Sequence, residues 1–125
     1  GAMIMTSQRQ IDDRPDVVQR FVTASIKGWD SYLHGDPSPG NTLIKHANPE
    51  MTDALLTYAI DTMKANGVVE SGDAAANGIG AMSASRWQRF FETMAGQGLY
   101  PPEMAWQRAF TLRFTGREPG QPAGR

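Results

Sequence analysis

The sequence predicts a mostly α-helical fold, with four or so amphipathic helices and one short strand near the N-terminus. Two observations support this prediction. Apolar residues recur at three- and four-residue steps in several segments, as they do along one face of a helix. Proline or a small polar residue stands where these segments begin, and glycine where they end. With 40% hydrophobic and 20% charged residues, the chain has the composition of a globular domain.

The clearest predicted helix covers residues 15–34. Pro15 suits the first helical position because the N–H that it lacks would have no partner there, and Asp16 complements the positive end of the helix dipole. Gly35 and the following Asp-Pro-Ser-Pro-Gly are expected to end the helix. The apolar face of this helix is formed by residues at three- and four-residue steps. They are Val18, Phe21, Val22, Ser25, Ile26, Trp29 and Leu33.

A second helix is predicted to follow Asn48, with Asn48 as the N-cap, Pro49 at the first position and Glu50 in the first turn. The pair Asn66-Gly67 is expected to end this helix in the left-handed backbone conformation common at helix C-termini. Its apolar stripe comprises Met51, Leu55, Leu56, Ala59, Ile60 and Met63.

Two further helices are predicted towards the C-terminus. The third is capped by Ser83 or Ser85 and ends at Gly96 and Gly98, and the fourth, shorter one begins at Pro102. Their apolar residues are Trp87, Phe90, Phe91 and Met94, followed by Met104, Trp106, Ala109 and Phe110.

The chain is long enough for one domain, which we place at residues 4–114. Residues 1–3, Gly-Ala-Met, are expected to be a cloning scar, and residues 115–125, rich in glycine and proline, a disordered tail. Ile4–Ser7 is the predicted strand, although so short a segment needs partners from elsewhere to form a sheet.

The composition of the chain excludes several classes of function. A net charge of −1 provides no broad field for nucleic acid or an anionic membrane, and no apolar run is long enough to insert in a bilayer. The absence of cysteine excludes disulfides, thiolate nucleophiles and cysteine-ligated zinc, and leaves the redox compartment open. No signal peptide is visible in this chain.

The residues that could carry chemistry are few, and each has a simpler explanation. Gly78-Ile79-Gly80 lacks the third glycine and the lysine of a phosphate-binding loop, which favours a connector between packed helices. Neither His34 nor His46 has a metal-ligand partner at helical spacing. The charged cluster Arg9, Asp12, Asp13, Arg14 and Asp16 suits the solvated start of a helix better than acid–base catalysis. We therefore expect no catalytic residue, metal or cofactor.

The large aromatic residues allow two interpretations. They could line a pocket for a flat ligand, but aromatic residues at helical spacing more often form a core. They are Trp29, Tyr32, Trp87, Phe90, Phe91 and Trp106.

Several stretches, taken in order, resemble the C-terminal part of an ABC-transporter solute-binding protein of the nitrate/sulfonate/taurine and thiamine-precursor family. They are RPDVVQRFVTASIKGW, the GDP stop, NPEMTDALL, the SGD…GIGAM link and RWQRFF. The resemblance extends over roughly residues 4–114. It implies a fragment of one lobe of a two-lobed α/β protein, the type II periplasmic-binding-protein fold. The main sheet and most of the ligand cleft would lie outside this chain.

The resemblance also implies a function. Such proteins capture a small organic solute of the nitrate, sulfonate or pyrimidine type in the periplasm and deliver it to an ABC permease, without catalysis. Ile4–Ser7 would be the strand that returns from the second lobe, so Thr6 and Ser7 are candidates for contacting the solute. The partners implied are the remaining lobe, the permease and the solute.

Two other functions compete with this one. A stand-alone helical module could dock a partner helix through an exposed apolar stripe. Some relatives of the family are enzymes that make a pyrimidine for thiamine, but they use histidine and cysteine residues that this chain lacks or does not show in a motif. Helices shaped to cover a sheet would also leave apolar faces exposed without it, so self-association is expected.

Overall fold

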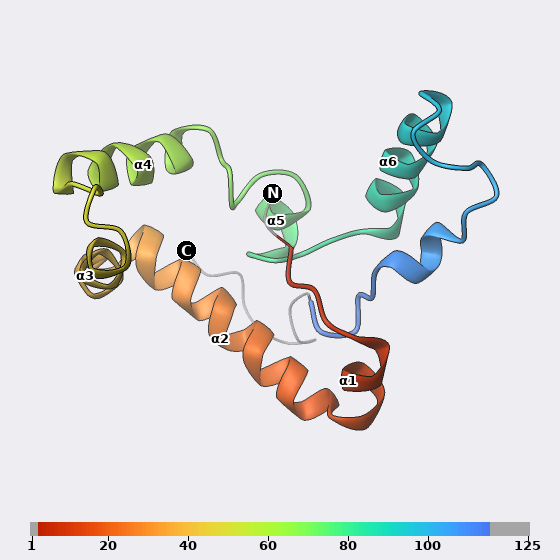
Figure 1. Cartoon of the computed structure of the whole chain (residues 1–125), viewed down its shortest axis with the longest axis horizontal. Coiled ribbons are helices and arrows are strands. Elements are labelled where there is room, and N and C mark those ends of the chain that lie inside the picture. Colours follow the sequence, from red (N-terminus) through yellow and green to blue (C-terminus); the bar gives the residue numbers. More distant parts are fainter. Residues whose placement is uncertain (1–2, 116–125) are drawn as a thin grey trace.

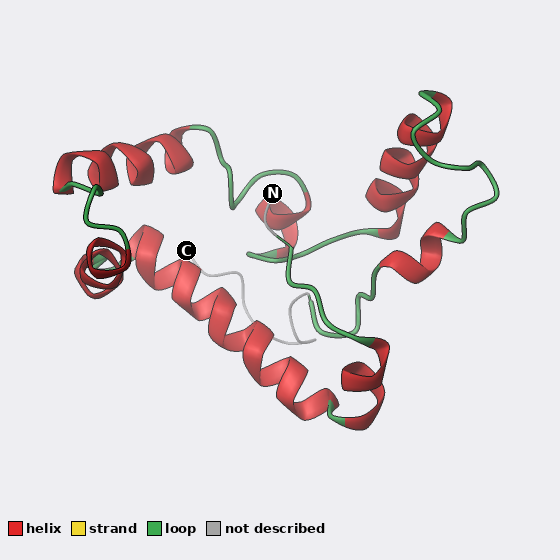
Figure 2. Cartoon of the chain, in the orientation of Figure 1, coloured by secondary structure: helices red, strands yellow, loops and turns green. Residues whose placement is uncertain are grey.

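The structure, a computed structural model, describes residues 3–115 as helices joined by loops (Figure 1). The elements are α1 (Gln8–Asp13), α2 (Pro15–His34), α3 (Ser38–Ala47), α4 (Asp53–Ala65), α5 (Asp73–Asn77), α6 (Ala84–Gly96) and the 3₁₀-helix η1 (Trp106–Ala109). Figure 2 shows no strand among these residues. The mostly α-helical prediction is confirmed.

The predicted strand at Ile4–Ser7 is wrong. A strand needs a neighbouring strand to satisfy its backbone groups, and none exists within residues 3–115. Ser7 instead becomes the N-cap of α1, where its Oγ accepts a hydrogen bond from the Gln10 amide at 3.1 Å. Residues 1–2 and 116–125, which include nearly all of the predicted tail, lie outside the described part of the chain.

Helix α2 has the predicted bounds, from Pro15 to His34. It ends where the Gly35 amide donates to the Ser31 carbonyl oxygen at 2.9 Å. Its apolar stripe is only partly covered, because Val18, Val22 and Leu33 are buried whereas Phe21 and Trp29 are exposed.

The second predicted helix begins later than expected, at Asp53 instead of Pro49. Asn48 and Thr52 are both possible N-cap residues. Thr52 takes this position, because its hydroxyl accepts a hydrogen bond from the Leu55 amide at 3.2 Å. Asn48 instead accepts a hydrogen bond from the Glu50 amide, which stabilises a turn.

Helix α3 is not predicted by the sequence pattern, because the prolines before it indicate a loop. Pro39 lies in the first turn of α3, where its missing N–H costs no helical hydrogen bond. The first amides of a helix have no acceptor within the helix. The Asp36 carboxylate provides one, because it accepts a hydrogen bond from the Ser38 amide at 2.9 Å.

Of the two predicted C-terminal helices, the first has the expected bounds and the second is shorter than predicted. Helix α6 covers Ala84–Gly96 as expected, but the Ser83 hydroxyl donates to Asp73 Oδ2 at 3.0 Å and makes no capping bond. The predicted helix from Pro102 is reduced to the single 3₁₀ turn of η1. So short a segment has too few backbone hydrogen bonds to form an isolated α-helix.

The helices form an open arrangement. In Figure 1, α1 lies beside the N-terminal end of α2. Helices α3 and α4 lie at the C-terminal end of α2, and α6 lies apart from these helices. The main buried cluster comprises Val18, Val22 and Phe114, with Ile11 and Ile26 packed against it. Leu33, Leu56 and Ile60 are the other buried apolar residues among those described.

The exposed surface is large for the mass of the chain. The accessible area is 9469 Å² for 13.7 kDa, whereas a compact monomer of that mass exposes about 6,600 Å². The difference, roughly 2,900 Å², exceeds the roughly 1,650 Å² that twelve residues with the composition of residues 1–2 and 116–125 would expose in a fully extended chain. Part of the excess therefore belongs to the helices.

Candidate functional site

Thr6 and Ser7, the two residues predicted to contact a ligand, lie at a hollow of about 380 Å³. The hollow is formed by the segment before α1 and the N-terminal half of α2. A volume of this size falls at the lower end of the range for small-ligand sites. Its lining residues are Ile4, Met5, Thr6, Ser7, Gln10, Val17, Val18 and Phe21.

The lining has little chemistry to offer. Five of these eight side chains are apolar and none is titratable, so the hollow cannot move a proton. Ser7 Oγ is already the acceptor for the Gln10 amide, which fixes the turn into α1. The arrangement can hold an apolar group beside a few neutral hydrogen-bonding groups.

None of the residues of the predicted charged cluster lines this hollow. Arg9 pairs with Asp13 at 3.3 Å on α1, and Arg20 pairs with Asp16 at 3.2 Å on α2. Both pairs have helical i,i+4 spacing and are exposed, and pairs of this kind stabilise a helix by only about 0.3–0.5 kcal/mol. The carboxylates therefore satisfy local charges on the helix surface.

Four of the predicted aromatic residues gather between α6 and η1. Trp87 stacks on Phe110 with centroids 5.1 Å apart, Phe110 on Trp106 at 6.1 Å, and Trp106 on Phe91 at 6.2 Å. Phe90 contributes edge contacts to Trp87 and Tyr100. The rings hold η1 against α6 and act as packing.

The remaining two predicted aromatic residues lie elsewhere, on α2. Trp29 and Tyr32 meet edge to face at 6.4 Å, and the Tyr32 hydroxyl donates to Asn41 Oδ1 of α3 at 2.7 Å. Tyr100, which contacts Phe90, is not predictable as part of the α6 cluster, because it falls in the loop before the predicted fourth helix.

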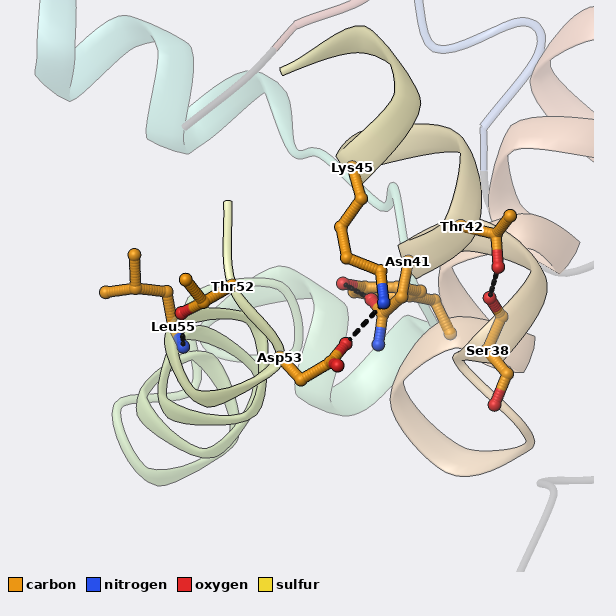
Figure 3. Close-up of polar contacts among 8 residues, drawn as sticks. Ser38, Asn41, Thr42, Lys45, Thr52, Asp53 and Leu55 are labelled. Atoms are coloured by element: carbon orange, nitrogen blue, oxygen red, sulfur yellow. Dashed lines mark hydrogen bonds and ion pairs between the residues drawn. The ribbon is translucent and has the colours of Figure 1, made fainter. Parts of the chain in front are cut away.

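Polar contacts join α2, α3 and α4 (Figure 3). Lys45 of α3 points to Asp53 at the start of α4, with Nζ 2.6 Å from Oδ1. Thr42 donates to the Ser38 carbonyl oxygen at 2.9 Å within α3. The Lys45–Asp53 pair connects α3 to α4, whereas the Thr42 bond lies within α3.

The histidines make no metal site. His34 Nε2 lies 2.9 Å from Glu70 Oε1, a partner 36 positions away that helical spacing could not reveal. His46 is exposed at the end of α3. Within residues 3–115, no three histidine or carboxylate side chains are placed to hold a metal ion.

The glycine-rich stretch connects α5 to α6. Gly78 and Gly80 adopt φ of 92° and 85°, a region that favours glycine. A Cβ built on Gly80 would lie 3.5 Å from Ile26 Cγ1, so the connector passes close to α2. It follows a short helix, whereas a phosphate-binding loop follows a strand.

Comparisons of this chain with protein-family models, with curated proteins and with solved structures found no match. None of the helices in the described range has the length and apolar character that crossing a membrane requires.

Proposed function

We propose that this chain is the helical part of a solute-binding protein that captures a small organic solute for an ABC permease in the periplasm. The proposal starts from the order of the stretches that resemble this family, in particular residues 14–29 and 86–91. It assigns the chain a non-enzymatic role, with the remaining lobe of the parent protein as its first partner.

The observation that carries the proposal is the open arrangement of amphipathic helices. Apolar side chains on three separate helices, Leu43 of α3, Tyr58 of α4 and Phe90 of α6, remain exposed. Monomeric soluble proteins rarely expose large contiguous apolar patches unless another surface covers them. In an α/β lobe, that cover is a sheet with helices packed on its faces.

The solute would be held only partly by this chain. Thr6 and Ser7 line the hollow at the start of α2 and would contribute hydroxyl groups, while the remaining lobe supplies the rest of the cleft. A solute of the nitrate, sulfonate or pyrimidine type needs several hydrogen bonds to be recognised, more than these hydroxyls and Gln10 provide.

Calorimetry on the isolated chain tests the incomplete site. Titration with taurine, nitrate or an aminopyrimidine is expected to give no binding tighter than about 1 mM. Addition of the remaining lobe, expressed from the same gene, should restore binding and slow amide exchange in α4 and α6 more than in α2. Tight one-to-one binding by the isolated chain would contradict the proposal, as would a gene that encodes no further lobe.

A stand-alone interaction module is the second candidate, and the α6–η1 unit favours it. This unit closes on its own aromatic cluster and keeps Phe90, Leu99 and Met104 exposed. Such a module would bind an amphipathic helix of a partner through these residues. Its gene would encode this chain alone, and Phe90→Glu would abolish partner binding without affecting solute uptake.

A further inference from the structure

We infer that Asn77, the last residue of α5, is a site of spontaneous deamidation, and that the reaction loosens the connector from α5 to α6. The product is aspartate or isoaspartate at residue 77. The inference goes beyond the proposed function and does not depend on it, because it uses only α5 and the residues that follow.

The chain contains two asparagine–glycine pairs in nearly the same local sequence. Residues 65–68 read Ala-Asn-Gly-Val, and residues 76–79 read Ala-Asn-Gly-Ile. Asparagine before glycine deamidates readily, because glycine has no Cβ to hinder the approach of its backbone nitrogen to the asparagine side chain. Since the flanking residues match, a difference in reactivity between Asn66 and Asn77 has to come from the structure around them.

The reaction at Asn77 needs only water and hydroxide. The backbone nitrogen of Gly78 loses its proton and forms a bond to Cγ of Asn77. The bond from Cγ to Nδ2 breaks, and Nδ2 takes up a proton and leaves as ammonia. Water then opens the resulting cyclic imide at either carbonyl carbon, which gives aspartate or isoaspartate.

Asn66 is held against the same reaction. It follows the 13-residue helix α4, and its Nδ2 donates a hydrogen bond to the Thr62 carbonyl oxygen at 2.9 Å. Its own amide donates to the same oxygen at 3.1 Å, and the Gly67 amide donates to the Lys64 carbonyl oxygen at 3.1 Å. Attack on Cγ of Asn66 therefore requires the side-chain bond and the backbone bonds of this helix end to break together.

Asn77 is held less firmly. Helix α5 has only five residues, none of them buried, and its N-cap Gly72 makes no side-chain capping bond. The Gly78 amide donates to the Ala74 carbonyl oxygen at 2.8 Å, but the exposed Asn77 side chain has no hydrogen-bond partner among residues 3–115. So short a helix is marginally stable, so its last turn opens at low cost and releases the Gly78 nitrogen.

The product is expected to disturb α5 and the connector after it. A carboxylate at the C-terminal end of a helix opposes the helix dipole, and isoaspartate adds a methylene to the backbone, which displaces Gly78 from Ala74. Helix α5 lies between α4 and α6 (Figure 1), and its residue Asp73 accepts a hydrogen bond from Ser83 Oγ at 3.0 Å. Loss of the α5 turn therefore loosens residues 78–83, which lead into α6.

Peptide mapping of the full chain tests the site. The protein is incubated at mildly alkaline pH, in buffer and in concentrated urea, and is then digested with trypsin and a glutamate-specific protease. Cleavage after Lys64, Glu70 and Arg86 places the two pairs in separate peptides, residues 65–70 and 71–86. In buffer, Asn77 should deamidate at least about 5-fold faster than Asn66, the factor that one net hydrogen bond provides. In urea the two rates should be nearly equal, because the local sequences match.

Asn77→Gln is the matched control, because the longer side chain closes the ring far more slowly. In this variant the peptide 71–86 should stay unmodified, whereas Asn66 should react as it does in the wild-type chain. A rate ratio between Asn77 and Asn66 that is no larger in buffer than in urea would overturn the inference.

Amide exchange of the incubated chain measures the consequence. Residues 78–83 should exchange faster after deamidation at Asn77, and residues 15–22 of α2 should be unaffected. Unchanged exchange in residues 78–83 would contradict the loosening of the connector. None of these measurements involves solute binding, so their failure is distinct from failure of the proposed function.

Discussion

Trp87 of α6 and Phe110, the residue after η1, stack with ring centroids 5.1 Å apart and ring planes within 2° of parallel. The contact fixes the C-terminal segment against α6, although their connecting loop contains two consecutive prolines. Aromatic pairs of this kind contribute about 0.5–1.5 kcal/mol beyond the area that they bury.

Phe110→Ala should therefore release η1 from α6. Because Phe110 is only half-buried, we expect a loss of about 2 kcal/mol, below the cost of removing a fully buried phenylalanine. Near-UV circular dichroism and amide exchange of residues 106–109 measure the release. Phe110→Tyr keeps the ring and should preserve both signals, and an unchanged exchange rate in the alanine variant would show that the stack does not hold η1.

Phe114 should be the most sensitive residue of the main core. It is buried against Val18 and Val22, and its carbonyl oxygen accepts a hydrogen bond from Gln19 Nε2, 95 positions earlier in the chain. Phe114→Ala should lower the free energy of unfolding by about 3 kcal/mol, measured by urea denaturation. The neighbouring exposed Leu112→Ala serves as the control and should cost less than about 1 kcal/mol.

Two glycines should respond in opposite directions to the same substitution. Gly28 lies inside α2, and no atom of a neighbouring residue lies within 4 Å of the position that a Cβ would occupy, so Gly28→Ala should stabilise the chain by about 0.5–1 kcal/mol. Gly72 has φ of 62°, and a Cβ there would meet the Arg86 guanidinium. Gly72→Ala should destabilise by about 1–2 kcal/mol. Thermal unfolding of both variants tests the prediction, which fails if the two shifts have the same sign.

Helix α3 should depend on pH through Asp36. The pKa of this carboxyl lies below its ordinary value because the side chain and the amide of Ser38 donate hydrogen bonds to it. A carboxyl with a lowered folded-state pKa stabilises the fold above the unfolded-state pKa, and this contribution is lost as the pH falls through the folded-state value.

The wild-type chain should thus lose part of its α3 stability below about pH 4, and Asp36→Asn should lack this component. The difference between their urea midpoints, followed from about pH 6 to about pH 3, isolates Asp36 from the other carboxyls. A difference that is constant across this range would refute the assignment.

The candidate site is only partly predictable from the sequence. The resemblance places Thr6 and Ser7 beside a hinge strand, close to a ligand. Both residues do line a hollow, but no strand forms there, and Ser7 is the N-cap of α1. The hollow also needs Val17 and Phe21 of α2, and no local pattern indicates that α2 folds back beside the segment before α1. The contact between His34 and Glu70 is hidden from the sequence for the same reason.

The helical character of the chain and the bounds of α2 follow from local sequence, because Pro15 and Gly35 act within one turn of the helix that they limit. Which apolar residues are buried depends instead on how the helices pack together. Leu33 and Leu56 are covered while Phe21 and Tyr58 on the same two helices are not. Helical periodicity describes one helix at a time, whereas burial depends on which surfaces meet, and here several apolar surfaces meet nothing within residues 3–115.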